Sequence, residues 1–168
     1  MKKLLFAVLL SCFVFTGRSQ DDADIIKVGD VMPAFTIVSD NGSEFKSVSL
    51  QGKVVLITFF ATWCPPCQKE LAAVQEMLWP KYQNNVNFVM LVIGREHSDE
   101  ELATYNEKKG FSFPLYPDKN RSIYSKFAKS LIPRVYLIGK DGKVVYAATG
   151  YNENDFAGLM NQIEKAIK

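Results

Sequence analysis

The chain has 168 residues, enough for one domain of ordinary size, and its 48% apolar and 23% charged residues are typical of a folded globular protein. This balance excludes a disordered, collagen-like or coiled-coil chain as a whole. Twenty basic against 18 acidic residues give a net charge of +2, and three of the basic residues lie in the first 18 positions. The rest of the chain is close to neutral, which argues against a nucleic-acid-binding surface or a polybasic membrane patch.

The first 19 residues match the pattern of an export signal peptide. Lys2 and Lys3 form a positively charged start, and a mostly apolar run follows over residues 4–16. Gly17 and Ser19 then place small residues before a cleavage site that would follow Ser19. The apolar run is short for a transmembrane helix, which needs roughly 18 apolar residues, so we expect the segment to be removed on export.

Two alternatives stay open for this segment. It could remain uncleaved as an anchor, or Cys12 could be lipidated, because residues 9–12 loosely resemble a bacterial lipoprotein box. Cleavage fits better, since apolar residues continue past Cys12 where polar ones are more usual. The expected organisation is a signal peptide over 1–19, a polar and loose lead-in over 20–30 and one domain over 31–168, located in the periplasm or cell envelope.

Beyond the lead-in, strand and helix patterns alternate along the chain. Two short strand patterns, at 34–38 and 44–50, flank Asp40-Asn41-Gly42 and predict a β-hairpin. Later strands are expected where apolar runs are bounded by turn residues, at 54–61, 86–93, 113–116, 135–138 and 143–148. Helices are expected where apolar residues recur at helical spacing or a capping residue opens the segment, at 65–82, 98–110, 121–129 and 152–167. Pro80 should end or kink the first of these helices.

Particular residues mark the ends of two helices. Ser98 with Glu101 forms a capping-box pattern, and Gly110 is placed to end the same helix. Asn152 can cap the last helix. Strands that alternate with helices predict an α/β domain whose parallel sheet is covered on both faces, and the late hairpin adds an antiparallel edge. We expect one hydrophobic core to serve the whole domain.

The segment Cys64-Pro65-Pro66-Cys67 lies where a buried strand passes into a helix. Cys64 would stand at the helix N-terminus, where free backbone N–H groups and the positive end of the helix dipole favour a thiolate. A thiolate is the form that attacks a disulfide. Cys67 follows one turn later, should be more buried, and can attack the mixed disulfide that Cys64 forms. Pro65 and Pro66 suit the first turn, where N–H groups lack partners in any case.

Two cysteines at this spacing can also form half of a zinc site. A structural zinc site needs two further ligands, and the chain beyond the signal offers one histidine, His97, and no other cysteine. We therefore expect no metal, and we expect His97 to be a solvated residue of a polar loop. Thiol chemistry at the two cysteines requires no cofactor.

The segment FFATWCPPCQKE resembles the active-site segment of thioredoxin-fold proteins, and it is most similar to the exported TlpA/ResA-like thiol–disulfide oxidoreductases. The other matching segments are Ile132-Pro133-Arg134, Asp141-Gly142-Lys143 and Thr149-Gly150. The resemblance runs over about residues 28–168. It implies a thioredoxin-like α/β fold with a central mixed β-sheet flanked by helices and an added N-terminal β-hairpin.

The resemblance also implies roles. Cys64 is the nucleophile, Cys67 is the resolving thiol, and together they form the redox-active disulfide. Pro133 is the cis-proline beside this disulfide, so that the backbone of Ile132 can pair with an extended substrate segment; taken alone, Pro133 would only indicate the start of a strand. The expected substrate-binding residues lie on these two loops: Trp63, Pro65, Pro66, Ile132 and Pro133.

Glu70 is the third candidate for a catalytic role. Cytoplasmic-type thioredoxins carry a buried aspartate six residues before the first active-site cysteine, and Thr58 occupies that position here. ResA-like proteins have a glutamate at the position of Glu70, one helical turn after Cys67. Glu70 could accept the Cys67 proton when that thiol must attack, although its charge would oppose thiolate formation. The alternative is a solvated acid that merely favours the helix N-terminus.

The leading hypothesis is an exported thiol–disulfide oxidoreductase that reduces protein disulfides, with cytochrome c maturation or envelope redox balance as the implied setting. The expected partners are protein thiols and disulfides and a membrane electron donor of the thiol-reductase type, with no nucleic acid and a monomeric chain. Two other hypotheses stay open: a peroxiredoxin-like thiol peroxidase, against which Cys67 beside Cys64 argues, and a copper-binding envelope chaperone. The chaperone would pair a distal histidine with two cysteines that have three residues between them, whereas Cys64 and Cys67 have two.

Overall fold

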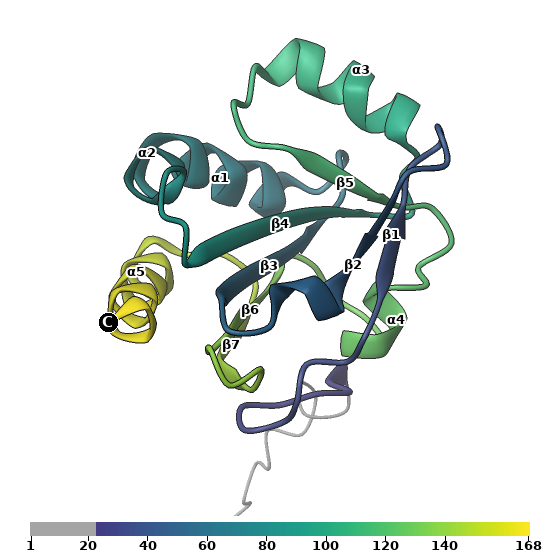
Figure 1. Ribbon diagram of the computed structural model, residues 1–168. Coiled ribbons are helices and arrows are strands. Elements are labelled where there is room, and N and C mark those ends of the chain that lie inside the picture. Colours follow the sequence, from purple (N-terminus) through teal and green to yellow (C-terminus); the bar gives the residue numbers. More distant parts are fainter. Residues whose placement is uncertain (1–22) are drawn as a thin grey trace, which may run out of the picture.

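A mixed five-stranded sheet forms the centre of the molecule, with the strands in the order β5-β4-β3-β6-β7 (Figure 1). The computed structural model describes residues 23–168, so the expected signal peptide and Cys12 lie outside the described residues. The strands are β3 (Val54–Phe60), β4 (Phe88–Arg95), β5 (Leu115–Asp118), β6 (Arg134–Ile138) and β7 (Val144–Thr149). β3, β4 and β5 run parallel to one another, while β6 runs antiparallel to both β3 and β7.

Helices follow the strands in the predicted order. They are α1 (Pro65–Ala73), α2 (Trp79–Tyr82), α3 (Asp99–Lys109), α4 (Tyr124–Phe127) and α5 (Glu153–Ile167). The predicted caps are confirmed: Ser98 and Glu101 form a capping box, Gly110 ends α3 in the left-handed conformation, and the Asn152 side chain accepts a hydrogen bond at the start of α5. Within residues 23–168, no helix is long and apolar enough to cross a membrane.

The predicted N-terminal hairpin is present as β1 (Thr36–Val38) and β2 (Glu44–Lys46), which pair antiparallel in a separate sheet. Gly42 occupies the turn with a φ of 81°, a conformation that glycine adopts without strain. The second strand is shorter than predicted, because a 3-10 turn begins at Ser47. The Ser47 hydroxyl there accepts a hydrogen bond from the backbone N–H of Phe35 at 2.9 Å. This bond connects the residue before β1 to the residue after β2.

The first helix differs from the prediction. Regular α-helix ends at Ala73, a π-helical turn of five residues follows over Val74–Leu78, and α2 begins at Trp79. Pro80 therefore lies in the first turn of a new helix, where its missing N–H costs nothing, instead of ending the first one. The bounds of three other elements also differ from the prediction. The strand predicted at 86–93 is β4 (Phe88–Arg95), the strand predicted at 113–116 is β5 (Leu115–Asp118), and the helix predicted at 121–129 is α4 (Tyr124–Phe127).

The expected single core is divided into two layers by the sheet. Along β3, Leu56 and Phe60 face α1 and α5, whereas Ile57 and Phe59 face α4 and the hairpin. Successive side chains of a strand point to opposite faces, so a strand buried on both sides feeds two separate clusters. Thr58 lies on the α1 side of this alternation, which places its hydroxyl among the residues of the first cluster.

The described part of the lead-in is packed against the domain, contrary to the expectation of a loose segment. Asp24 forms an ion pair with Arg134, the first residue of β6, whose side chain is only 2% exposed. The carbonyl of Ala23 also accepts a hydrogen bond from the N–H of Lys129 at 2.8 Å. A buried guanidinium needs a counter-charge, and the polar composition of the lead-in gave no sign that Asp24 supplies it.

Replacing Asp24 by alanine should therefore destabilise the protein by about 3 kcal/mol, because Arg134 keeps its buried charge and loses its partner. The free energy of unfolding, measured by urea denaturation, reports the loss. Asp40→Ala is the matched control, since Asp40 carries the same charge on an exposed turn. Equal stabilities of the two variants would contradict a role for the lead-in in holding β6.

Candidate active site

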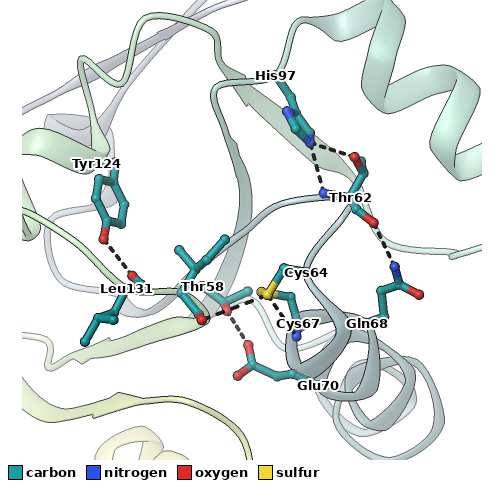
Figure 2. The surroundings of a disulfide bond; sticks show 10 residues. Thr58, Thr62, Cys64, Cys67, Gln68, Glu70, His97, Tyr124 and Leu131 are labelled. Atoms are coloured by element: carbon teal, nitrogen blue, oxygen red, sulfur yellow. Dashed lines mark hydrogen bonds between the residues drawn. A yellow bond between two sulfur atoms is a disulfide. The ribbon is translucent and has the colours of Figure 1, made fainter.

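Cys64 and Cys67 form a disulfide at the junction of β3 and α1 (Figure 2). Cys64 is the N-cap residue of α1, and its Sγ accepts a hydrogen bond from the backbone N–H of Cys67 at 3.3 Å. The predicted placement at a helix N-terminus is thus confirmed. Both residues are buried, Cys67 completely and Cys64 nearly so. Free N–H groups and the positive end of the helix dipole at this position stabilise negative charge on Cys64 more than on Cys67.

The loop before β6 lies directly against the disulfide. Antiparallel pairing sets Arg134, at the start of β6, opposite Phe59 near the end of β3. The preceding Ile132–Pro133 peptide bond is cis, as the resemblance implied. The carbonyl oxygen of Ile132 lies 3.9 Å from the Sγ of Cys64. A backbone carbonyl of this loop therefore faces the sulfur of Cys64.

The predicted contact residues differ in their exposure. Trp63, just before the disulfide, is 63% exposed, so it is free to contact a partner. Pro65 and Pro66 are exposed in the first turn of α1, whereas Ile132 is half-buried and Pro133 is buried. Pro133 can thus shape the loop but offers little surface, and the exposed contacts come from the other predicted residues.

Glu70 is a buried carboxyl group and not the solvated acid of the alternative interpretation. It is 3% exposed, and it reaches from α1 toward β3, where it accepts a hydrogen bond from the hydroxyl of Thr58 (Figure 2). Its pKa is raised from 4.5 to about 7, because the effect of burial exceeds the opposite effect of the hydrogen bond from Thr58. Thr58, at the position of the thioredoxin aspartate, therefore holds the buried carboxyl group of Glu70.

His97 is also buried, which corrects the prediction of a solvated surface residue. Its side chain is 6% exposed, and Nε2 accepts a hydrogen bond from the backbone N–H of Thr62 at 2.9 Å. The chain turns back at this point through a bond from the N–H of His97 to the carbonyl of Gly94, and the imidazole packs edge-on against Phe60. The carbonyl of Thr62 accepts a further bond from Gln68. Side chains thus hold both backbone groups of the residue that lies two positions before Cys64.

Sequence reasoning missed His97, Thr62 and Gln68 as parts of this site. Gly94 is the one signal that could have pointed to it, since a Cβ there would lie 2.7 Å from the side chain of Leu102 and 3.2 Å from the Cβ of His97. Within residues 23–168, no three His, Cys, Asp or Glu side chains are grouped so that they could hold a metal ion.

Comparison with known proteins decides the family. The redoxin family matches residues 27–163. The chain belongs to the redoxin family. The ResA thiol–disulfide oxidoreductase of Bacillus cereus is 32% identical over 131 residues, which cover 77% of this chain and 73% of the relative. ResA of Bacillus subtilis is 30% identical over 154 residues, which cover 90% and 81% of the two chains.

A solved structure agrees with this assignment. A protein of Bacteroides thetaiotaomicron, described as a candidate protein disulfide isomerase, has a TM-score of 0.81 and 33% identity over 86% of this chain and 92% of its own. The thioredoxin-like fold predicted from the active-site segment is therefore confirmed. Within the redoxin family, this chain is a ResA-like thiol–disulfide oxidoreductase.

The burial of Glu70 predicts that the stability of the oxidised protein depends on pH. The folded state binds the Glu70 proton more tightly than the unfolded chain, whose pKa is about 4.5, so stability falls as the pH rises from 4.5 to about 7. Glu70→Gln removes this loss. Its stability relative to the wild type should therefore rise by about 3 kcal/mol between about pH 4 and about pH 8.

Urea denaturation of both oxidised proteins at the two pH values measures this difference. The control is Glu76→Gln, since Glu76 is an exposed acid in the helical turn that follows α1. Its stability relative to the wild type should be the same at both pH values. A constant difference between Glu70→Gln and the wild type would show that Glu70 is not desolvated.

Proposed function

We propose that this ResA-like protein reduces disulfides of other proteins outside the cytoplasm, with Cys64 as the attacking thiolate and Cys67 as the resolving thiol. The observation that carries the proposal is the position of the Cys64 sulfur. It lies at the N-terminus of α1, belongs to the less deeply buried of the two cysteines, and faces the Ile132 carbonyl across 3.9 Å. Only this sulfur combines a stabilised negative charge with a side open to a substrate.

The reaction consists of two thiol–disulfide exchanges. In the reduced protein, the Cys64 thiolate attacks one sulfur of a substrate disulfide, which forms a mixed disulfide and releases the other substrate sulfur as a thiolate that takes up a proton. Cys67, after losing its proton, attacks the Cys64 sulfur. This second step releases the remaining substrate thiol and leaves the Cys64–Cys67 disulfide. Two electrons have then passed to the substrate, and a donor must return them before the next cycle.

The Ile132 loop supports the binding of an extended substrate segment. A cis bond before Pro133 turns the backbone of Ile132 toward the disulfide, where its carbonyl can accept a hydrogen bond from a substrate N–H. Trp63, which is exposed next to Cys64 in the chain, would supply an apolar surface for the same segment. Backbone pairing of this kind accepts many sequences, which suits an enzyme that acts on protein cysteines.

Glu70 is proposed as the acceptor of the Cys67 proton. A pKa of about 7 leaves the carboxyl group partly ionised near neutral pH, where a general base works best. Glu70 also borders a small cavity of about 10 Å³ that is lined by residues of β7 and α5. A cavity of this size has room for about one water molecule, which could take up the proton. The ionised carboxylate opposes formation of a nearby thiolate, so Glu70 affects both the rate and the equilibrium.

The direction of electron flow depends on the reduction potential of the cysteine pair. A reductase requires a value near the roughly −270 mV of thioredoxin, in contrast to the roughly −120 mV of the oxidant DsbA. In this proposal the electrons come from a membrane thiol reductase, the signal peptide over 1–19 directs the monomeric chain to the periplasm or envelope, and the substrates include apocytochrome c cysteines. Lipidation of Cys12 is the alternative to release.

The other two functions differ in their substrates. A thiol peroxidase would turn over with peroxide, whereas the proposed reductase needs a disulfide. A copper chaperone would use a histidine as a ligand, and Nε2 of His97 is already engaged by the N–H of Thr62. Insulin reduction without added metal therefore separates the proposal from both.

The two cysteines should fail in different ways when replaced. Cys64→Ser should reduce insulin no faster than the uncatalysed reaction, because no nucleophile remains. Cys67→Ser should accumulate a mixed disulfide between Cys64 and the substrate, which mass spectrometry of non-reduced samples detects. In the reduced wild type, iodoacetamide at neutral pH should label Cys64 first. Labelling of Cys67 alone would overturn the assignment.

Glu70→Gln should have two opposite effects on the thiol pair. Loss of the negative charge should lower the apparent pKa of the pair by about 1, while loss of the base should slow the attack by Cys67 by about 100-fold. A thiolate titration at about 240 nm and stopped-flow release of the second substrate thiol measure the two quantities. If both match those of the Glu76→Gln control, Glu70 has only a structural role.

A further inference from the structure

Arg95, the last residue of β4, connects the two loops that flank the disulfide. The central carbon of its guanidinium lies 5.7 Å from the centre of the Trp63 ring and 5.3 Å from that of the Tyr124 ring. The Tyr124 hydroxyl in turn donates a hydrogen bond to the carbonyl of Leu131 at 2.6 Å, in the loop that leads to Ile132 (Figure 2). One cation therefore contacts the residue before Cys64 directly and the opposite loop through Tyr124.

The guanidinium of Arg95 keeps hydrogen-bonding capacity. Aromatic rings contact a guanidinium over its faces, while its N–H groups point outward in its plane. The Nε of Arg95 lies 3.3 Å from a carboxylate oxygen of Glu96. The two terminal nitrogens are not sealed from solvent, and no residue within 23–168 accepts a hydrogen bond from them. The side chain is 12% exposed, so this free edge is what an approaching partner would meet.

Glu96, the carboxylate next to Arg95, is shared with a second guanidinium, because Nη1 of Arg121 lies 3.7 Å from its other carboxylate oxygen. Arg121 also donates a hydrogen bond to the carbonyl of Lys129, so its own bonding is directed into the protein. Asp118, which pairs with Arg95 across β4 and β5, accepts hydrogen bonds from the backbone N–H groups of Ile123 and Tyr124. The terminal nitrogens of Arg95 are therefore guanidinium donors of this cluster that no described residue engages.

Backbone conformation marks the same cluster. Within residues 23–168, three residues other than glycine have a left-handed φ: Glu96 at 67°, Arg121 at 57° and Leu131 at 71°. Each belongs to the network around Arg95 and Tyr124. Side chains other than glycine rarely adopt this conformation, and such residues gather at ligand-binding and active sites, where the surrounding contacts hold them.

We propose that Arg95 determines specificity for the partner protein by binding a carboxylate that stands next to the attacked cysteine. The partner segment is extended, its backbone pairs with Ile132, and an Asp or Glu side chain close to its cysteine receives two N–H donors from the free edge of Arg95. This inference rests on the proposed function and names the substrate class of the same site: protein segments with an acidic residue beside the cysteine.

Three peptides that differ in one residue test the proposal. Each carries a cysteine in a mixed disulfide with 5-thio-2-nitrobenzoate, and the next residue is Glu, Gln or Lys. The reduced wild-type protein should react with the Glu peptide about three to ten times faster than with the Gln peptide, and more slowly still with the Lys peptide. The preference should shrink as the salt concentration rises. Stopped-flow release of the yellow thiolate gives each second-order rate constant.

Variants assign the preference to Arg95. In Arg95→Met the ratio of the Glu to the Gln rate should fall to about one. Arg95→Lys keeps the charge without the planar edge, and its ratio should lie between those of Arg95→Met and the wild type. Lys53→Met removes one charge at the opposite end of β3, and it should keep the wild-type ratio.

A wild-type ratio of one, or an unchanged ratio in the Arg95 variants, would overturn the proposal. If circular dichroism shows that Arg95→Met does not fold, the reduced ratio in Arg95→Lys decides. Failure of the proposed function gives a different result, since the wild type would then react with no peptide faster than Cys64→Ser does.

Discussion

Antiparallel pairing of β6 with β3 is the constraint on which the rest of the site depends. It places the start of β6 beside the end of β3, so that Ile132 lies 3.9 Å from Cys64 although 68 residues separate them in the chain. β4 runs parallel to β3, and its carboxyl end therefore lies at the same edge of the sheet. Arg95 and His97 reach the loop before Cys64 for this reason. The start of β6 and the carboxyl ends of β3 and β4 therefore all lie at the same edge of the sheet.

Alternation along β3 explains the buried acid. Thr58 points to the same face as α1, whereas its neighbours Ile57 and Phe59 face the other layer. An apolar residue in place of Thr58 would leave the carboxyl group of Glu70 buried without its hydrogen-bond donor, which is costly. The Thr58 hydroxyl lowers the cost of burying the Glu70 carboxyl group, but burial still raises the pKa of Glu70. The site therefore combines a carboxyl group whose pKa is raised to about 7 with a local loss of stability, a combination that active sites commonly show.

Local features of the chain could be predicted, and contacts between distant segments could not. The junction at Cys64, the capping box of Ser98 and Glu101 and the hairpin around Gly42 each depend on residues a few positions apart. The bond between His97 and Thr62 spans 35 positions. Nothing in the polar residues around His97 indicates that Phe60 and Gly94 make room for its ring. The π-helical turn was missed because a single turn of five residues leaves the apolar spacing of the rest of the helix unchanged.

The most distant of these contacts links the stability of the fold to the site itself. Arg134 directly follows Pro133, and its buried guanidinium is held by Asp24, 110 positions earlier. Arg134 also donates a hydrogen bond to the carbonyl of Ser130, on the other side of the cis-proline. One side chain therefore ties both ends of the loop that faces the disulfide to the N-terminal segment. Cleavage after Ser19, as proposed, leaves Asp24 in the exported chain, so the ion pair that holds this loop survives removal of the signal.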